Sequence, residues 1–332
     1  MPELAKRLLA RDRDAVSEAL NLIDDRRPAE REAALTMLAA VERGGSAGGA
    51  YRIGITGAPG AGKSTLLDAC VRELRAADAT VGIIAVDPSS QRSGGALLGD
   101  RFRMRSSARD PGVFVRSMAA RERLGGLADA THAGIEILAS VFDYVFVETV
   151  GVGQSEGDVA RQVDTTIFVA QPGAGDMLQF MKAGVLELPD VFVVNKADLG
   201  AVAERTASEL SAGLGLGESK SSGWKAPVLM LSARDGTGID EMLSAAREHR
   251  TALEKSKELQ VRRADARASY VSEALTRRFG SYGVERIGGS EALQTRIRDA
   301  CRSEGASAFE LLSQLADEIE VLLADKPETS TP

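Results

Sequence analysis

A glycine-rich octapeptide near residue 60 constrains the fold of this chain more than any other feature. It fits the pattern G-x-x-x-x-G-K-[ST] and consists of Gly57, Ala58, Pro59, Gly60, Ala61, Gly62, Lys63 and Ser64. A strand-like run precedes it and a helical pattern follows it, which is the setting that this pattern requires. There the glycines let backbone N–H groups face phosphates, and the helix N-terminus favours anions. We therefore predict a nucleotide-binding loop that includes Thr65, with Lys63 on the β- and γ-phosphates and Ser64 on Mg²⁺.

Short β-branched runs alternate with helical patterns through the middle of the chain. The expected strands cover residues 52–56, 81–86, 113–116, 144–148, 166–170, 191–195 and 228–231. Several of these runs are nearly continuous in Val, Ile and Phe, which suits strands covered on both faces. Strands separated by helices indicate βαβ units. The predicted fold class is therefore α/β, a P-loop NTPase parallel sheet flanked by helices.

A second motif follows one of these strands and predicts which base is bound. Its four residues are Asn195, Lys196, Ala197 and Asp198. An aspartate at this turn can accept hydrogen bonds from both N1–H and the 2-amino group of guanine, and adenine does not offer this pair. Hydrogen bonds to a charged group contribute about 1.5–3 kcal/mol each. Ser232 and Ala233 follow the last strand, where a backbone N–H can meet the guanine oxygen. The two segments predict a site for GTP and GDP.

A third motif predicts the metal and the rate of hydrolysis. Glu148 begins Glu-Thr-Val-Gly, where GTPases usually carry Asp-x-x-Gly. The carboxylate of that motif holds Mg²⁺ through water, and the longer Glu still reaches the metal's water shell. Ras-like enzymes place a glutamine directly after the glycine, whereas this chain has Val152 there and Gln154 two positions further. We therefore place Glu148 and Gln154 among the catalytic candidates and expect slow hydrolysis unless a partner completes the site.

For two further acidic residues and one loop, the neighbouring sequence allows two interpretations each. Asp87 ends an expected strand and Asp100 follows a Gly-rich segment, so each is either a metal ligand or a surface residue. The Pro-Gly sequence after residue 171 begins either a conformational switch or a plain connector. The candidate switch residues are Gln171, Asp176, Gln179 and Lys182.

Composition limits the partners of the chain. A net charge of -7 argues against binding nucleic acid by neutralising many phosphates. No apolar run reaches the roughly 18 residues of a membrane span, so no membrane partner is expected. Cys70 and Cys301 are far apart and only two histidines are present, which predicts no soft-metal cluster and two reduced, buried thiols. We expect a cytoplasmic protein.

Helical segments are expected on both sides of the nucleotide-binding region. Apolar residues at helical spacing predict two helices before residue 44, the second beginning near Pro28. A long charged helix is expected from about Leu253 to Phe279, and Ser307 is the predicted cap of a last helix. The expected domains are an N-terminal helical segment (1–48), the P-loop GTPase domain (49–250) and a C-terminal helical arm (251–332).

Taken together, the motifs closely resemble those of the MeaB/ArgK/MMAA family. The segments that carry the resemblance are Val86–Ser90, Ser93–Gly95, Leu98–Arg101, Glu148–Glu156, Pro172–Asp176 and Asn195–Asp198. Members of this family are GTPases that chaperone adenosylcobalamin-dependent acyl-CoA mutases such as methylmalonyl-CoA mutase.

The resemblance implies a GTPase that gates cofactor loading, protection or repair of such a mutase, and whose hydrolysis the mutase stimulates. It assigns Asp87, Asp100 and Glu148 to the metal and switch machinery. Lys63 and Asp100 therefore join Glu148 and Gln154 as catalytic candidates. It also makes the segment 171–182 an additional switch that couples the nucleotide to the partner, with Lys182 at its working end. A homodimer formed through the C-terminal arm is a further implication.

Two other functions compete with the chaperone reading. One is a P-loop kinase that passes the γ-phosphate of GTP or ATP to a protein or a small molecule. The chain lacks an obvious acceptor-binding domain, and its guanine motif is one that switch proteins favour. The other is a nickel metallochaperone GTPase, which the lack of a Cys/His cluster disfavours.

Overall fold

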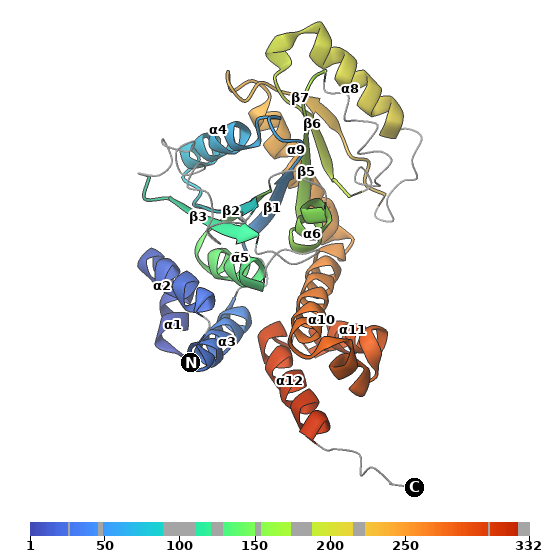
Figure 1. The fold of residues 1–332 in the computed structure, drawn as a ribbon. Coiled ribbons are helices and arrows are strands. Elements are labelled where there is room, and N and C mark those ends of the chain that lie inside the picture. Colours follow the sequence, from blue (N-terminus) through green and yellow to red (C-terminus); the bar gives the residue numbers. More distant parts are fainter. Residues whose placement is uncertain are drawn as a thin grey trace. The chain divides into compact units, whose positions relative to one another are not determined.

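The computed structural model describes residues 1–25, 27–45, 49–88, 110–120, 129–149, 154–173, 188–214, 223–304 and 306–324. These residues form two compact units (Figure 1). One unit is Gly48–Leu259, and the other combines the two ends of the chain, Met1–Ala47 and Gln260–Pro332. The three-part division expected from the sequence remains a prediction.

The larger unit contains a parallel sheet whose described strands number seven. They are β1 (Tyr51–Thr56), β2 (Val81–Pro88), β3 (Val113–Ala120), β4 (Tyr144–Thr149), β5 (Thr165–Ala170), β6 (Val191–Val194) and β7 (Val228–Met230). Their order is β3-β2-β4-β1-β5-β6-β7, and every neighbouring pair is parallel. The predicted fold class is confirmed, and each expected strand lies where the sequence places it, within a few residues at its ends.

Helices cover both faces of this sheet (Figure 1). On one face, α4 (Lys63–Ala76) and α9 (Ile239–Lys255) enclose a core with the side chains of Ile53 and Ile55. On the other, α5 (Asp129–Val141), α6 (Gln154–Gln162) and α8 (Ala201–Leu214) pack on the strands. Double coverage explains the continuous apolar runs, since every residue of β1, β5 and β6 is buried, on both faces of the sheet.

The strand register brings the carboxyl ends of the central strands together. Ile55 of β1 pairs with Glu148 of β4, and Thr56 pairs with Phe168 of β5. The segments that follow β1, β4, β5, β6 and β7 therefore begin at one edge of the sheet. In open α/β sheets this edge is where ligands bind.

The smaller unit is helical. Its N-terminal helices are α1 (Glu3–Leu9), α2 (Arg13–Asp24) and α3 (Pro28–Gly44). The expectation of two helices in this region is wrong, because the chain turns at Arg11, whose φ is 62°, and Asp12 caps α2 by accepting a hydrogen bond from Asp14 N–H. Pro28 occupies the first turn of α3 as predicted.

The C-terminal helices of this unit are α10 (Glu258–Arg286), α11 (Gly289–Asp299) and α12 (Ala308–Ala324), with a short π-helical segment, η5 (Ala300–Glu304), before α12. The single long helix expected from Leu253 onward is wrong, since α9 ends at Lys255 and Lys257 has a φ of 62°. Ser307 does precede α12, and Glu42 of α3 accepts hydrogen bonds from Ser307 Oγ (2.7 Å) and Ala308 N (2.8 Å). A carboxylate from another helix thus reinforces this cap.

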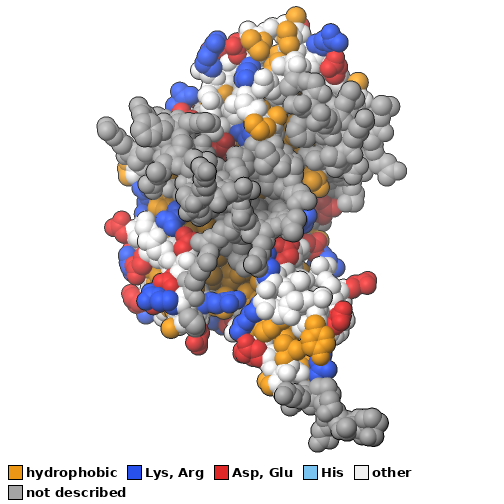
Figure 2. All heavy atoms as spheres, viewed as in Figure 1, with side chains coloured by type: hydrophobic (Ala, Val, Ile, Leu, Met, Phe, Trp, Pro, Cys, Tyr) orange, Lys and Arg blue, Asp and Glu red, His pale blue; other side chains and the backbone are white. Residues whose placement is uncertain are grey.

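The surface, the helix lengths and the cysteines can each be compared with the sequence analysis. Basic and acidic side chains are interspersed on the face shown in Figure 2. In the part of the chain that the structure describes, no helix combines the length and the apolarity of a membrane span. Cys70 and Cys301 are free and buried, as predicted.

Candidate functional site

The glycine-rich loop connects β1 to α4 at the carboxyl edge of the sheet. The Lys63 ammonium donates hydrogen bonds to the carbonyl oxygens of Gly57 (2.7 Å) and Ala58 (3.0 Å), and the residue is only 7% exposed. The first turn of α4 contains no acidic residue of its own, so its positive end faces the loop. A buried cation and a helix N-terminus are features that favour an anion such as phosphate.

Gly62 is the last glycine of the loop, and its backbone and surroundings disfavour any other residue. Its φ is 90°, which L residues adopt at a cost, and a Cβ there would lie 2.4 Å from Nδ2 of Asn195. The loop and the segment after β6 therefore touch at this point, with no room for a side chain.

Asn195 connects three segments of the site. Its Nδ2 donates to the carbonyl oxygen of Ala61 in the loop (2.8 Å). Its Oδ1 accepts from the backbone N–H groups of Lys196 (2.8 Å) and Ala233 (3.0 Å). The side chain of Lys196 adds a hydrogen bond to the carbonyl oxygen of Gly60 (2.9 Å). These bonds hold together residues that are far apart in sequence.

Ser64 and Glu148 lie next to each other beside the loop. Ser64 Oγ donates to Glu148 Oε1 at 2.7 Å, and Glu148 is 7% exposed at the end of β4. A hydroxyl and a carboxylate are hard oxygen donors, and Mg²⁺ in nucleotide sites uses one or two such groups with phosphate oxygens and water. The donor set fits Mg²⁺. The described residues contain no cluster of three or more His, Cys, Asp or Glu side chains that would hold a metal by themselves.

Asp198 follows β6, and its carboxylate contacts polar side chains of the segment that follows β7. Ser232 Oγ lies 3.0 Å from Asp198 Oδ1 and 2.9 Å from Asp235 Oδ2, and its single proton serves one of the two. Arg234 contacts both carboxylates, with Nη2 3.3 Å from Asp198 Oδ2 and Nε 3.0 Å from Asp235 Oδ1. The guanidinium and then the Ser232 hydroxyl lower the pKa of Asp235.

Sequence reasoning missed Arg234 and Asp235. The signal that points to them is a basic and an acidic residue directly after the Ser-Ala pair. Hydrogen bonding to Asp235 and the charges of both carboxylates raise the pKa of Arg234, so this side chain stays cationic.

The structure also places part of the predicted switch. Gln171 follows β5, and its Oε1 lies 3.5 Å from the position that a Cβ on Gly60 would occupy, so this side chain is beside the loop. Asp176, Gln179, Lys182 and Asp100 lie outside the described residues. Asp87 lies in β2 and Gln154 begins α6, and for both only the backbone is described.

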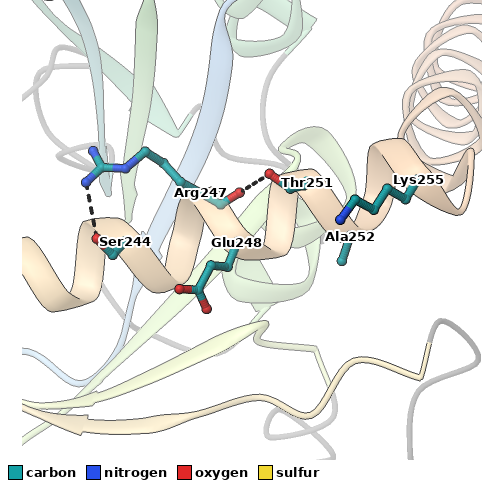
Figure 3. A pocket seen from close by; sticks show the side chains of 6 residues that line it. All are labelled: Ser244, Arg247, Glu248, Thr251, Ala252 and Lys255. Carbon is teal, nitrogen blue, oxygen red and sulfur yellow. Dashed lines mark hydrogen bonds between the residues drawn. The ribbon is translucent and has the colours of Figure 1, made fainter.

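A shallow hollow on α9 is separate from this site (Figure 3). Its lining comes from one helix and consists of Ser244, Arg247, Glu248, Thr251, Ala252 and Lys255. Two of these side chains are held by local hydrogen bonds, Arg247 to Ser244 Oγ (3.4 Å) and Thr251 to the Arg247 carbonyl oxygen (3.0 Å). The hollow contains none of the predicted site residues.

Comparisons with known proteins identify relatives along most of the chain. The family described as "Methylmalonyl Co-A mutase-associated GTPase MeaB" matches residues 16–281. A putative GTPase of Pyrococcus abyssi is 45% identical over 264 residues, 79% of either chain. The mouse protein named "Methylmalonic aciduria type A homolog, mitochondrial" is 35% identical over 267 residues, 77% of this chain and 64% of that one. The crystal structure of a LAO/AO transport system kinase has a TM-score of 0.68 and 29% identity, and the match covers 96% of this chain and 97% of the other.

Proposed function

Since the chain belongs to the MeaB family of methylmalonyl-CoA mutase-associated GTPases, we propose that it chaperones an adenosylcobalamin-dependent acyl-CoA mutase. It is a GTPase that binds guanine nucleotide. GTP turnover would time the loading, protection or repair of the mutase cofactor. The client is methylmalonyl-CoA mutase or a close relative that acts on another acyl-CoA. The observation that supports this proposal most is the family match over residues 16–281.

The phosphate end of the proposed site uses the loop and the two oxygen donors beside it. Lys63 Nζ would exchange its bonds to the loop carbonyls for the β- and γ-phosphates, which are stronger acceptors because they are charged. Ser64 and Glu148 would hold Mg²⁺, Glu148 through water, with Asp87 and Asp100 in the same machinery. The metal neutralises charge that develops on the phosphate oxygens.

The base end of the proposed site is Asp198. Both of its carboxylate oxygens would accept from guanine, one from N1–H and one from the 2-amino group. Asn195 supports this role indirectly, because it ties the motif to the loop and to Ala233 N–H with bonds of 2.8 Å and 3.0 Å. Lys196 supports it through its bond to Gly60. Fixing these segments before the ligand arrives lowers the cost of ordering them on binding.

Coupling to the partner is proposed to run through the segment after β5. Gln171 lies beside Gly60, and the switch would continue through Asp176 and Gln179 to Lys182. Hydrolysis by the chain alone would be slow, with Gln154 as the candidate that a bound mutase repositions. We further propose a homodimer formed through the C-terminal helices.

The test is GTP turnover with and without purified mutases. We expect the cognate mutase to raise kcat. Asp198→Asn should lose stimulated GTP turnover and gain stimulated turnover of xanthosine triphosphate. Xanthine carries a 2-carbonyl in place of the 2-amino group of guanine, so the Asn amide can accept from N1–H and donate to that carbonyl. Arg247→Ala, at an exposed arginine of α9, is the matched control and should behave as wild type. If no candidate mutase changes kcat, the chaperone role is contradicted.

A kinase is the second candidate, and the specific observation in its favour is the match to the LAO/AO transport system kinase structure. A kinase would transfer the γ-phosphate to an acceptor, whereas a GTPase transfers it to water. Incubation with γ-labelled GTP and the mutase separates the two. We expect the label in inorganic phosphate, and label in protein or in a small molecule would favour the kinase.

A further inference from the structure

Arg234 forms an ion pair with Asp198, the proposed guanine-binding carboxylate, and no other cation among the described residues does so. Its Nη2 lies 3.3 Å from Asp198 Oδ2, while Ser232 Oγ lies 3.0 Å from the other oxygen, Oδ1. Ser232 is 3% exposed, whereas the Arg234 side chain is 73% exposed. The hydroxyl thus approaches Asp198 from within the protein, and the guanidinium approaches it from the solvent.

A guanine base would also approach Asp198 from the solvent. It needs an acceptor for N1–H and another for the 2-amino group, so both oxygens of Asp198 must face it. The Asp198 side chain is 22% exposed, so the surface through which a base can reach it is small. Arg234 occupies part of that approach, at the oxygen that Ser232 does not contact.

Asp235 binds Arg234 at the same time as Asp198 does. Its Oδ1 lies 3.0 Å from Arg234 Nε, and its side chain is 45% exposed. The backbone that carries both residues is closed into a tight turn, with hydrogen bonds from Ser232 N to the Thr237 oxygen (3.0 Å) and from Gly236 N to the Ser232 oxygen (2.8 Å). Arg234 already contacts both carboxylates, so giving up Asp198 while keeping Asp235 requires only rotation of an exposed side chain.

We propose that Arg234 competes with guanine for Asp198, and that Asp235 holds Arg234 while the base is bound. This inference rests on the proposed role of Asp198. Arg234 and Asp235 are then positioning residues with opposite effects: Arg234 speeds the release of guanine nucleotide, and Asp235 slows it. Such a pair tunes nucleotide exchange without touching the phosphates.

The experiment measures the Kd and release rate of N-methylanthraniloyl-GDP with Mg²⁺ on the full chain. Arg234→Ala should bind about two- to fivefold more tightly, the range set by an exposed ion pair. Asp235→Asn, which keeps an acceptor for Ser232, should bind more weakly because Arg234 then pairs with Asp198 alone. The double variant should match Arg234→Ala. High salt should shrink these differences, since exposed charges are screened.

Two further variants separate the possible failures. Arg247→Ala also removes an exposed, ion-paired arginine and should leave both quantities unchanged. Asp198→Asn should lose affinity for GDP and gain affinity for xanthosine diphosphate; if it does neither, the proposed guanine role itself is wrong. If Asp198→Asn behaves as expected but Arg234→Ala weakens GDP binding or leaves it unchanged, the competition alone is refuted. Effects of the same sign for Arg234→Ala and Asp235→Asn would also refute it.

Discussion

Gly62→Ala should damage the protein more than Gly60→Ala, although the two glycines share a left-handed backbone with φ values of 90° and 80°. That backbone costs an alanine about 1–2 kcal/mol at either position. At Gly60 the new Cβ would meet its nearest atom, Oε1 of Gln171, at an ordinary 3.5 Å. At Gly62 it would lie 2.4 Å from Nδ2 of Asn195, so that side chain must move.

The extra cost at Gly62 follows from the bonds that Asn195 makes. Moving its amide breaks the 2.8 Å hydrogen bond to the buried Ala61 carbonyl, and an unsatisfied buried group costs about 1–3 kcal/mol. The same movement disturbs the 3.0 Å bond to Ala233 N–H, which positions the segment after β7. Gly62→Ala should therefore lose about 1–3 kcal/mol more stability than Gly60→Ala, and more affinity for GDP.

The assay is urea unfolding followed by the fluorescence of Trp224, the single tryptophan of the chain. Its Nε1 donates to the Asp190 carbonyl oxygen at 2.8 Å, so it reports on the unit that contains the loop. Titration with GDP gives the second quantity. Equal stability and equal GDP affinity in the two variants would show that the contact with Asn195 does not constrain the loop.

Three other substitutions test the phosphate site, a buried ion pair and a buried thiol. Lys63→Ala should abolish tight GTP binding in calorimetry, and unchanged affinity would place the phosphates elsewhere. Arg52 is buried, and its guanidinium donates hydrogen bonds of 2.7 Å and 2.8 Å to the Glu136 carboxylate. Glu136→Ala should lower the free energy of unfolding, measured in urea, by about 3–5 kcal/mol, because it leaves this buried charge unpaired. Replacing both residues with Met should recover most of the loss. Burial raises the pKa of the Cys70 thiol from 9.0 to about 12. Between these values the folded state keeps a proton that the unfolded state loses, so the free energy of unfolding should fall as pH rises through that interval. Cys70→Ala should flatten this alkaline slope, and an unchanged slope would contradict the assignment.

The sheet and the loop were predictable because local pattern and tertiary environment agree there. Runs such as 191–194 are apolar on every residue, which is what a strand between two helical layers needs. The octapeptide at 57–64 carries its own geometry, since its glycines adopt conformations that other residues avoid. The pairing of Ser64 with Glu148 then follows from parallel strands that end at one edge.

Contacts made by single side chains between distant segments were not predictable. The motif containing Asn195 suggested base recognition, but its bond to Ala61 depends on how two loops meet in space. Helix breaks were missed for a related reason. Arg11 and Lys257 turn the chain with positive φ values, and neither residue type signals such a turn. Arg234 was overlooked because a charged residue after a turn is usually a solvated one.

We propose that one site at the carboxyl edge of the sheet binds Mg²⁺–GTP. A crystal structure of the chain with Mg²⁺ and a non-hydrolysable GTP analogue tests it most directly. We expect phosphates along residues 57–64, with Lys63 Nζ on phosphate oxygens, Ser64 Oγ on the metal and the guanine edge on Asp198. A triphosphate bound elsewhere, for example in the hollow on α9, or a base turned away from Asp198, would contradict it.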